Sequence, residues 1–457
     1  MSSIIDPGSF RDRDGFVFFK EDKCYRAIRK CFAKTWDEFL ASGVYAQLHD
    51  EGKLVALKEC STDLFPDLKT DLHKVYEVET IPFISYPGEW SFSQLKKAAL
   101  LTLYIQKKAV DKGFCLKDAS VYNLQFIGNR VLFIDSLSFD PYHETEPWQA
   151  YGQFCRHFLA PLLLEAYGVP ESHGFFLNHM DGVPLELCAR LLPWKSKFDL
   201  LAYTHIHLHA RMEKKHAGDR ELKQENFQYS KKKLLSLLEH LEMGIKDLKS
   251  TGKTSNWTDY YDSFSYSKEG FEAKQVFVKR HCETLKGRLC LDLGANSGVF
   301  SFIAAEHFQQ VLACDSDASV LQSIRLQKKP NVLTLKVDLN NPLPAYGWHS
   351  KERQSFIERA KGNDLTLALA LVHHLCIGNN LPFDLLARFF SDLSKHLIIE
   401  FVPKEDEQVK KLLVSRKDVF SDYTQAHFEK AFLNHYEKLD EQTLPGSARV
   451  LYFFRRK

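Results

Sequence analysis

The feature that most constrains this sequence is a glycine-bearing turn that directly follows a short apolar run. Residues 288–293 are mostly apolar and lead into residues 292–298, which read DLGANSG. Val299, Phe302 and Ile303 then recur at helical spacing, so the turn opens a helix. Glycine lets a chain turn sharply and approach a ligand closely, and the free N–H groups at a helix start attract negative groups. The turn therefore predicts a ligand-binding site.

Strands and helices alternate after this turn, which predicts an α/β domain with a parallel, doubly wound sheet. We expect further strands at 310–315, 331–337, 365–371, 397–401 and 449–454, with helices at 297–307 and 318–328. Ligands of such sheets bind at the carboxyl ends of the strands. Asp315 ends the second strand and Asp338 follows the third. Their carboxylates are suited to accept hydrogen bonds from a ribose diol and from an adenine amino group, respectively.

A nicotinamide oxidoreductase is the first alternative for such a fold. Its dinucleotide-binding loop would place glycine at 294, 296 and 299. Asn296 and Val299 stand there instead. This departure disfavours a dinucleotide.

The order of the motifs resembles the class I S-adenosylmethionine-dependent methyltransferases. The resemblance covers roughly residues 255–457 and is carried by residues 291–298, Asp315 and Asp338. It implies a seven-stranded Rossmann-like sheet with an antiparallel last strand, and S-adenosyl-L-methionine as cofactor. The residues it assigns to the cofactor are Asp292, Gly294, Asn296, Ser297, Gly298, Asp315, Asp338 and Leu371. A domain that kept this fold and lost the cofactor is the alternative, because fold alone does not secure function.

Two adjacent histidines, His373 and His374, follow the fourth strand. In the family that this sequence resembles, this point faces the methyl group and the acceptor, so either histidine is a candidate catalytic base. The alternative is that one of them only packs. The Asn/Asp-Pro-Pro-aromatic tetrapeptide of methyltransferases that act on nucleobase amino groups is absent, which disfavours a nucleobase acceptor. Upstream aromatic residues at 257–261 and Tyr266 either cover the cofactor or pack as a docking helix.

The N-terminal half predicts a separate α+β domain. We expect a hairpin over 16–28, a helix over 36–49, strands at 54–58 and 76–85, a long helix over 93–112 and a hairpin at 128–129. Asp118, Asn123 and Asp135 then resemble the catalytic loop and metal-binding aspartate of protein and aminoglycoside kinases. Leu116 stands where a histidine is usual, and no glycine-rich phosphate loop precedes the hairpin. We therefore predict a degenerate, kinase-like domain without appreciable phosphoryl transfer.

The two halves together resemble a group of bacterial methyltransferase-like proteins that includes nodulation-associated members. This resemblance is carried by residues 118–123, Ile134, Asp135 and residues 403–423. The predicted division is an N-terminal domain over 1–210, a charged helical linker over 211–254 and a methyltransferase domain over 255–457. The predicted function is methyl transfer from S-adenosylmethionine to an oxygen or nitrogen acceptor. The alternative is a nucleotide-binding or phosphotransferase protein whose methyltransferase-like domain only senses the cofactor.

The composition of the chain disfavours several classes of binding partner. The formal net charge is +2, so a broad basic field is missing and a nucleic acid partner is disfavoured. The apolar runs are far shorter than the ~18 residues that a membrane helix needs, so we expect no membrane partner. None of the 10 cysteines forms a C-x-x-C pair, and His205, His207 and His209 would diverge on a helix, so we expect no metal. Unpaired cysteines fit a cytoplasmic protein. The acceptor stays open between a small molecule, a glycan and a protein.

Overall fold

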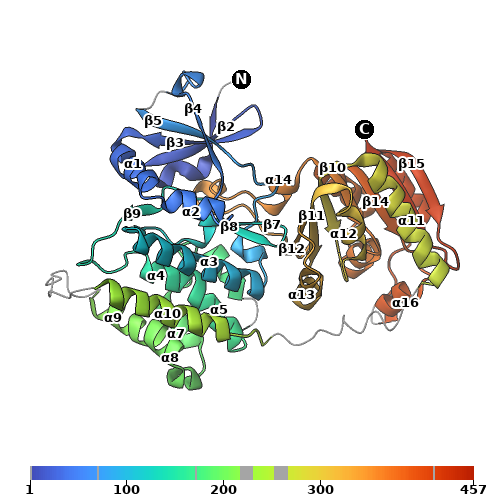
Figure 1. Ribbon diagram of the computed structural model, residues 1–457. Helices are drawn as coiled ribbons and strands as arrows, with labels where there is room; N and C mark the ends of the chain where they lie inside the picture. The colour runs from blue at the N-terminus through green and yellow to red at the C-terminus, as the bar shows by residue number, and fades with distance from the viewer. Residues whose placement is uncertain (1–2, 69–70, 170–171, 217–229, 252–265, 415–416) are drawn as a thin grey trace.

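The computed structural model describes residues 3–68, 71–169, 172–216, 230–251, 266–414 and 417–457. The upstream aromatic run at 257–261 and part of the predicted linker lie outside these residues. Figure 1 shows the N-terminal half beside the C-terminal sheet, with helix α14 (Phe356–Ala360) between them. Within the described residues, no helix combines the length and the apolar character that crossing a bilayer requires.

The N-terminal half begins with a five-stranded antiparallel sheet whose strand order is β1-β2-β3-β5-β4. The predicted hairpin forms, with its turn at Glu21 and Asp22, both at positive φ. The predicted helix over 36–49 is two helices, because the chain turns at Gly43, where φ is 73°. The bounds are β1 (Ile4–Ile5), β2 (Gly15–Lys20), β3 (Lys23–Arg29), α1 (Ala33–Ala41), α2 (Val44–Asp50), β4 (Leu57–Cys60) and β5 (Leu72–Val78).

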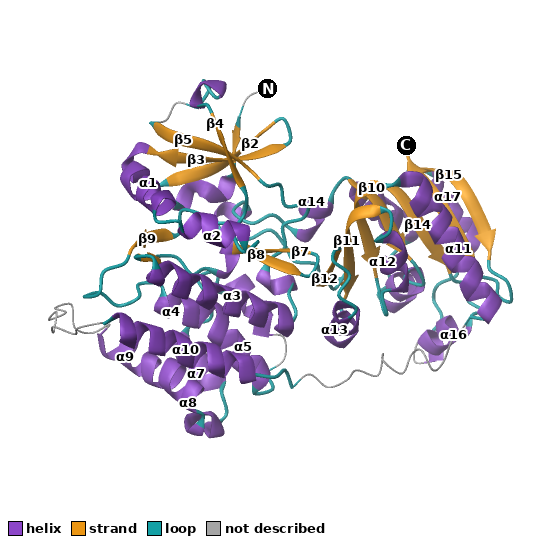
Figure 2. Ribbon diagram, in the orientation of Figure 1, coloured by secondary structure: helices purple, strands orange, loops and turns teal. Residues whose placement is uncertain are grey.

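A helical layer lies below this sheet (Figure 2). Its long helix α3 (Phe92–Asp111) begins at Ser91, whose side chain accepts from the backbone of Gln94 while Gln94 bonds back to Ser91. Two short ribbons follow, β6 (Phe114–Leu116) with β9 (Phe139–Pro141) and β7 (Leu124–Ile127) with β8 (Arg130–Phe133). The remaining helices are α4 (Tyr151–Phe154), α5 (Ala160–Ala166), α6 (Phe175–Asn178), α7 (Leu185–Leu191), α8 (Leu200–Ala202), α9 (His209–His216) and α10 (Lys231–Asp247).

Helix α10 belongs to the stretch predicted as a linker, and it packs against α3. Leu234, Leu238, Leu241 and Ile245 are buried along its inner face. Glu242 pairs with Lys107 of α3. The charged helix is therefore amphipathic and joins the helical layer of the N-terminal half. The domain boundaries themselves stay a prediction.

The C-terminal half contains a seven-stranded sheet with the order β12-β11-β10-β13-β14-β16-β15. Its strands are parallel except β16, which runs antiparallel to both neighbours. This confirms the seven-stranded sheet with an antiparallel last strand. The bounds are β10 (Gly287–Leu293), β11 (Phe308–Asp315), β12 (Val332–Lys336), β13 (Asn363–Ala368), β14 (Ser394–Phe401), β15 (Tyr436–Thr443) and β16 (Val450–Arg456).

Helices cover both faces of this sheet (Figure 2). Alternate residues of β10 serve the two faces, with Cys290 in one apolar cluster and Leu291 in the other. Phe277 of α11 packs in the cluster with Cys290, and Phe390 of α15 in the cluster with Leu291. The helices are α11 (Lys268–Leu285), α12 (Val299–Ala304), α13 (Ala318–Leu326), α14, α15 (Phe383–Leu393), α16 (Glu407–Val414) and α17 (Gln425–Leu433).

The loop that precedes α14 contacts both layers of the N-terminal half. Glu352 is buried and accepts a hydrogen bond from Arg11, beside the five-stranded sheet, at 2.5 Å. Tyr346 donates to the hydroxyl of Tyr122 at 3.3 Å, in a loop of the lower layer. Arg353 lies over the Tyr122 ring, 4.7 Å from its centroid. One loop of the C-terminal half therefore holds both N-terminal layers.

Candidate functional site

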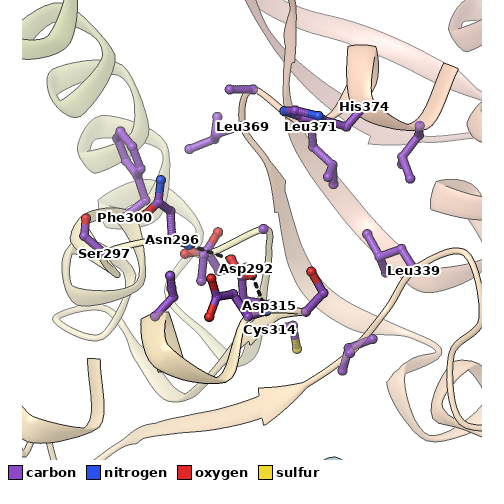
Figure 3. Close-up of a pocket in the computed structure, with 18 of the residues that line it drawn as sticks. Asp292, Asn296, Ser297, Phe300, Cys314, Asp315, Leu339, Leu369, Leu371 and His374 are labelled. Carbon is purple, nitrogen blue, oxygen red and sulfur yellow. Dashed lines mark hydrogen bonds between the residues drawn. The ribbon is translucent and has the colours of Figure 1, made fainter. Parts of the chain in front are cut away.

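A cavity of about 310 Å³ opens at the carboxyl ends of strands β10 to β13 (Figure 3). Seven of the eight residues assigned to the cofactor line it, all except Gly298. These are Asp292, Gly294, Asn296, Ser297, Asp315, Asp338 and Leu371. The volume lies at the lower end of the ~300–1,000 Å³ typical of small-molecule sites. The cavity therefore sits where the sheet topology places ligands.

Three residues of the turn adopt left-handed backbone, with φ of 74° at Gly294, 44° at Asn296 and 79° at Gly298. A Cβ added at Gly294 would meet only Leu371, at 3.5 Å, so this glycine leaves cavity space open. A Cβ at Gly298 would lie 2.9 Å from Ile324 of α13. The two glycines thus have different roles: Gly294 shapes the cavity, and Gly298 lets the start of α12 pack closely.

Asp315 lies opposite this turn. Its Oδ2 accepts from the backbone N–H of Asn296 at 3.1 Å, a bond drawn in Figure 3, and its Oδ1 accepts from the N–H of Asp317 at 2.9 Å. Burial raises the pKa of this carboxyl. Each oxygen of a carboxylate has about two lone-pair sites, so both retain acceptor capacity toward a ligand.

The other two acidic residues of the site differ sharply in exposure. Asp292 is buried, accepts a hydrogen bond from Ser301 at 2.5 Å, and has its pKa raised to about 6 by burial. Asp338 is exposed, lies two residues beyond β12 and accepts from the N–H of Asn340. Asp292 thus stiffens the floor of the cavity, whereas Asp338 stands at its solvent edge.

The structure separates the two candidate bases. His374 lines the cavity together with Leu371 and Leu375, and burial lowers its pKa. His373 is fully buried, and neither of its ring nitrogens has a hydrogen-bond partner among the described residues. The two rings lie 4.2 Å apart between centroids. Only His374 is placed to meet a ligand in the cavity.

Sequence reasoning did not find a buried charge cluster beside the cavity. Lys274 of α11 lines the cavity, and its Nζ lies 2.6 Å from Glu400 and 2.9 Å from the Tyr266 hydroxyl. Tyr266 donates to Glu400 at 2.8 Å, and Arg449 lies 3.4 Å from Glu400. Burial alone would raise the pKa of Glu400, but the charges of Lys274 and Arg449 lower it below its usual value. The one available signal was a lone glutamate in the apolar strand β14.

Glu400 also fixes the loop that carries the histidines. Its Oε2 accepts from the backbone N–H of Ala370 at 2.9 Å. Ala370 has a φ of 51°, a left-handed conformation that is costly for a residue with a Cβ. The buried carboxylate therefore stabilises a strained backbone directly before Leu371.

The residues predicted to form a kinase-like motif lie in the N-terminal half, and each acidic group already has partners. Asp135 accepts from Arg26 of β3 at 2.7 Å, and Asn123 donates to Ser138 at 3.1 Å. Asp118 accepts from the N–H of Ser120 at 2.8 Å and from a side-chain amide at 2.7 Å. Burial, then the charge of Asp135, raises the pKa of Asp118. Arg26 was missed because nothing in the sequence marks it as the partner of Asp135.

The three histidines of the run make contacts with other side chains of the helical layer. His205 bonds to Tyr151 at 2.7 Å, His207 bonds to Ser196 at 2.8 Å, and the His209 ring stacks on Tyr151 at 4.9 Å between centroids. Across the described residues, no three His, Cys, Asp or Glu side chains are arranged to hold a metal ion.

A full-length relative decides which family this chain belongs to. Nodulation protein NoeA of Rhizobium meliloti strain 1021 is 35% identical over 463 residues, which cover 98% of this chain and 95% of that protein. The chain belongs to the NoeA family. This confirms the resemblance to nodulation-associated proteins at the level of the family. No family model matches the chain.

Solved structures align with parts of this NoeA family member. N-methyltransferase NodS from Bradyrhizobium japonicum WM9 aligns at 11% identity and a TM-score of 0.32, over 42% of this chain and 98% of that one. The bifunctional kinase-methyltransferase WbdD aligns at 15% identity and a TM-score of 0.30, over 43% of this chain and 41% of that one. TM-scores this low support no conclusion, so the fold of the NoeA family member rests on its own strand order.

Proposed function

We propose that this chain is an S-adenosylmethionine-dependent methyltransferase that acts on an oxygen or nitrogen acceptor. The observation that carries the proposal is the cavity at the strand ends, where the turn of Gly294 faces the carboxylate of Asp315. The strand order with an antiparallel β16, which the resemblance implied, supports it further.

The residues of the cavity fit this cofactor. Gly294 leaves room where any other side chain would project, and Asp315 retains acceptor capacity for a ribose diol. Asp338 and Leu339 line the wall expected to hold the adenine. When bound, S-adenosylmethionine supplies a methyl group that its sulfonium already activates.

The chain's own residues then have three tasks. The turn and Asp315 hold the ligand at a fixed depth. The Nζ of Lys274 lies 4.6 and 4.9 Å from the ring centroids of Tyr266 and Phe300 and adds a positive charge to the wall of the cavity. Glu400 forms an ion pair with it. His374, whose pKa is lowered by burial, is neutral near pH 7 and accepts a proton from a hydroxyl or amine acceptor.

We infer that the N-terminal half is a kinase-like scaffold that shapes or recruits the acceptor. The support is the order of sheet, long helix and loop together with the sequence positions of Asp118, Asn123 and Asp135. Arg26 takes up the carboxylate that a kinase would use for magnesium, which argues against phosphoryl transfer. We propose a cytoplasmic location, where the unpaired cysteines of the described residues would stay reduced.

The decisive experiment combines calorimetry with a transfer assay. The full chain should bind S-adenosylmethionine, and labelled methyl should pass to a component of fractionated cell extract. His374→Asn should keep cofactor binding and lower transfer by about 10²–10⁴-fold, the range for a general base. If the chain does not bind the cofactor, the proposal is wrong. If it binds without transfer to any fraction, the sensing alternative gains support.

A further inference from the structure

Three large apolar side chains project from one surface turn of the helical layer. Trp194, Phe198 and Leu200 are 74%, 81% and 67% exposed. They belong to the 3-10 helix Trp194–Phe198 and to α8, at the lower tip of the molecule in Figure 1. The Trp194 and Phe198 rings contact each other edge to face, 5.6 Å apart between centroids. Clustered exposure of this kind marks an interaction surface, whereas single exposed side chains are ordinary.

The turn is firmly anchored, so its exposure is a property of the fold. Ser196 is buried between the projecting residues and bonds to His207 at 2.8 Å. Asp199 accepts from the backbone N–H groups of Leu201 at 2.9 Å and Ala202 at 3.2 Å, and from the Tyr167 hydroxyl at 2.8 Å. These bonds hold the inner side of the turn while its apolar side faces outward.

Two lysines lie between the projecting rings. Residues 194–198 read WKSKF, so this segment carries two positive charges and no negative one. Lys195 and Lys197 are both exposed, and Lys195 extends over the Tyr167 ring at 5.8 Å from its centroid. Lysines with long apolar stems can place their charges at the level of lipid phosphates while neighbouring rings lie deeper.

We propose that this turn binds the surface of a bilayer that contains anionic lipids. Trp194, Phe198 and Leu200 would enter the boundary between headgroups and acyl chains, and Lys195 and Lys197 would contact the phosphates. Tryptophan at a projecting apolar tip with interleaved lysines suits a lipid interface better than the acidic or apolar groove of a protein. A surface contact needs no spanning helix, so this proposal revises our expectation of no membrane partner.

Vesicle sedimentation with the full chain tests the proposal. Vesicles of phosphatidylcholine alone are compared with vesicles in which about a third of the lipid is phosphatidylglycerol. We expect binding to the anionic vesicles that weakens with added salt. Trp194→Ser with Phe198→Ser should lower the bound fraction about tenfold, and Lys195→Glu with Lys197→Glu should abolish the preference for anionic lipid. Trp348→Ser, at an equally exposed tryptophan outside the turn (73%), is the matched control and should bind as the parent does.

Three outcomes would overturn the proposal. In the first, the parent protein stays in the supernatant with anionic vesicles. In the second, the serine double variant sediments like the parent. In the third, the parent is a dimer, the serine variant is a monomer, and neither binds vesicles. The last would assign the turn to a second copy of the chain. Melting temperature and cofactor binding confirm that each variant is folded. If the serine variant fails to fold, the lysine variant decides alone, because its side chains are exposed.

Discussion

Arg359 and Glu89 form a buried ion pair that joins the two halves of the chain, although they are 270 positions apart in the sequence. The guanidinium donates to both carboxylate oxygens, at 2.5 and 3.0 Å, and also to the carbonyl of Ile84 at 2.6 Å. Both side chains are nearly inaccessible, at 3% and 2% exposure. The junction between the halves therefore contains a charge pair that neither half could leave buried alone.

Glu89→Ala should destabilise the protein by about 3–5 kcal/mol, because it leaves the Arg359 charge buried without its partner. Thermal unfolding followed by circular dichroism measures this as a large drop in melting temperature. Glu186→Ala breaks the exposed pair with Arg190 and is the matched control, with little expected change. Equal effects of the two variants would show that the junction is not buried in solution.

Asp315→Ala should weaken S-adenosylmethionine binding by about 1.5–3 kcal/mol, the range for hydrogen bonds to a charged group. Isothermal titration calorimetry gives the dissociation constant directly. Asp338→Ala, at the exposed edge of the same cavity, should cost less. Unchanged affinity in Asp315→Ala would remove this residue from the cofactor site.

Gly294→Val should abolish cofactor binding while the fold persists. The new side chain would enter the cavity, and valine tolerates a φ of 74° poorly. Gly362→Val separates the two effects, because Gly362 has a φ of 77° and open space around its Cβ position. Gly362→Val should introduce only the backbone strain and should bind the cofactor normally. Binding by Gly294→Val would mean that no ligand crosses this turn.

Asp135→Asn should lower stability by about 1–3 kcal/mol, since Arg26 loses its charged partner at a largely buried position. Thermal unfolding measures this loss, and a separate assay for ADP release tests phosphoryl transfer. We expect no appreciable ATP turnover from the full chain with magnesium, in the parent or in Asp118→Ala. Release of ADP that disappears in Asp118→Ala would instead establish a phosphotransferase.

Acidification should destabilise the fold between about pH 6.5 and pH 4. Burial lowers the pKa of His157 to about 3 and the pKa values of His173 and His205 to about 4. The unfolded chain takes up protons on these groups near pH 6.5 and the folded chain does not, so stability is complete above that pH and falls below it.

Buried carboxyls oppose this trend, because their protonation favours the fold. Burial raises the pKa values of Asp12 and Asp292 to about 6 and also raises those of Asp118, Glu165 and Asp315. Among the described residues, burial lowers the pKa values of nine histidines and raises those of five carboxyls, so the melting temperature should still fall. A melting temperature that rises from pH 6.5 to pH 4 would contradict the burial of the histidines.

The sequence located the ends of β10 and β11 well, because apolar runs that stop near Asp292 and Asp315 are local signals. The strand predicted over 365–371 ends earlier, at Ala368, because the chain turns through left-handed backbone at Ala370. Strand β15 was not predicted, because its polar and mostly exposed residues have the pattern of a loop, and only pairing with β16 makes them a strand. Seven of the residues that the resemblance assigns to the cofactor line the cavity, and their role in binding it stays a prediction. Their place in the cavity follows the predicted topology.

Residues that act through distant partners could not be found in this way. Little in the local sequence distinguishes Arg26, Lys274 and Glu400 from the other charged residues of the chain, and only the folded chain brings their partners near. His373 and His374 are adjacent in sequence, so spacing could not tell which one enters the cavity. The backbone at the start of the π-helix His374–Gly378 determines that His374 is the one that lines the cavity.

The loop at 346–353 has a mechanical consequence. It is bonded to Arg11 beside the upper sheet and to Tyr122 in the lower layer of the N-terminal half. Any movement of those two layers apart would pull these two attachments in different directions. The two N-terminal layers should therefore move together with the C-terminal sheet, and a hinge motion between them would first have to break one of these attachments.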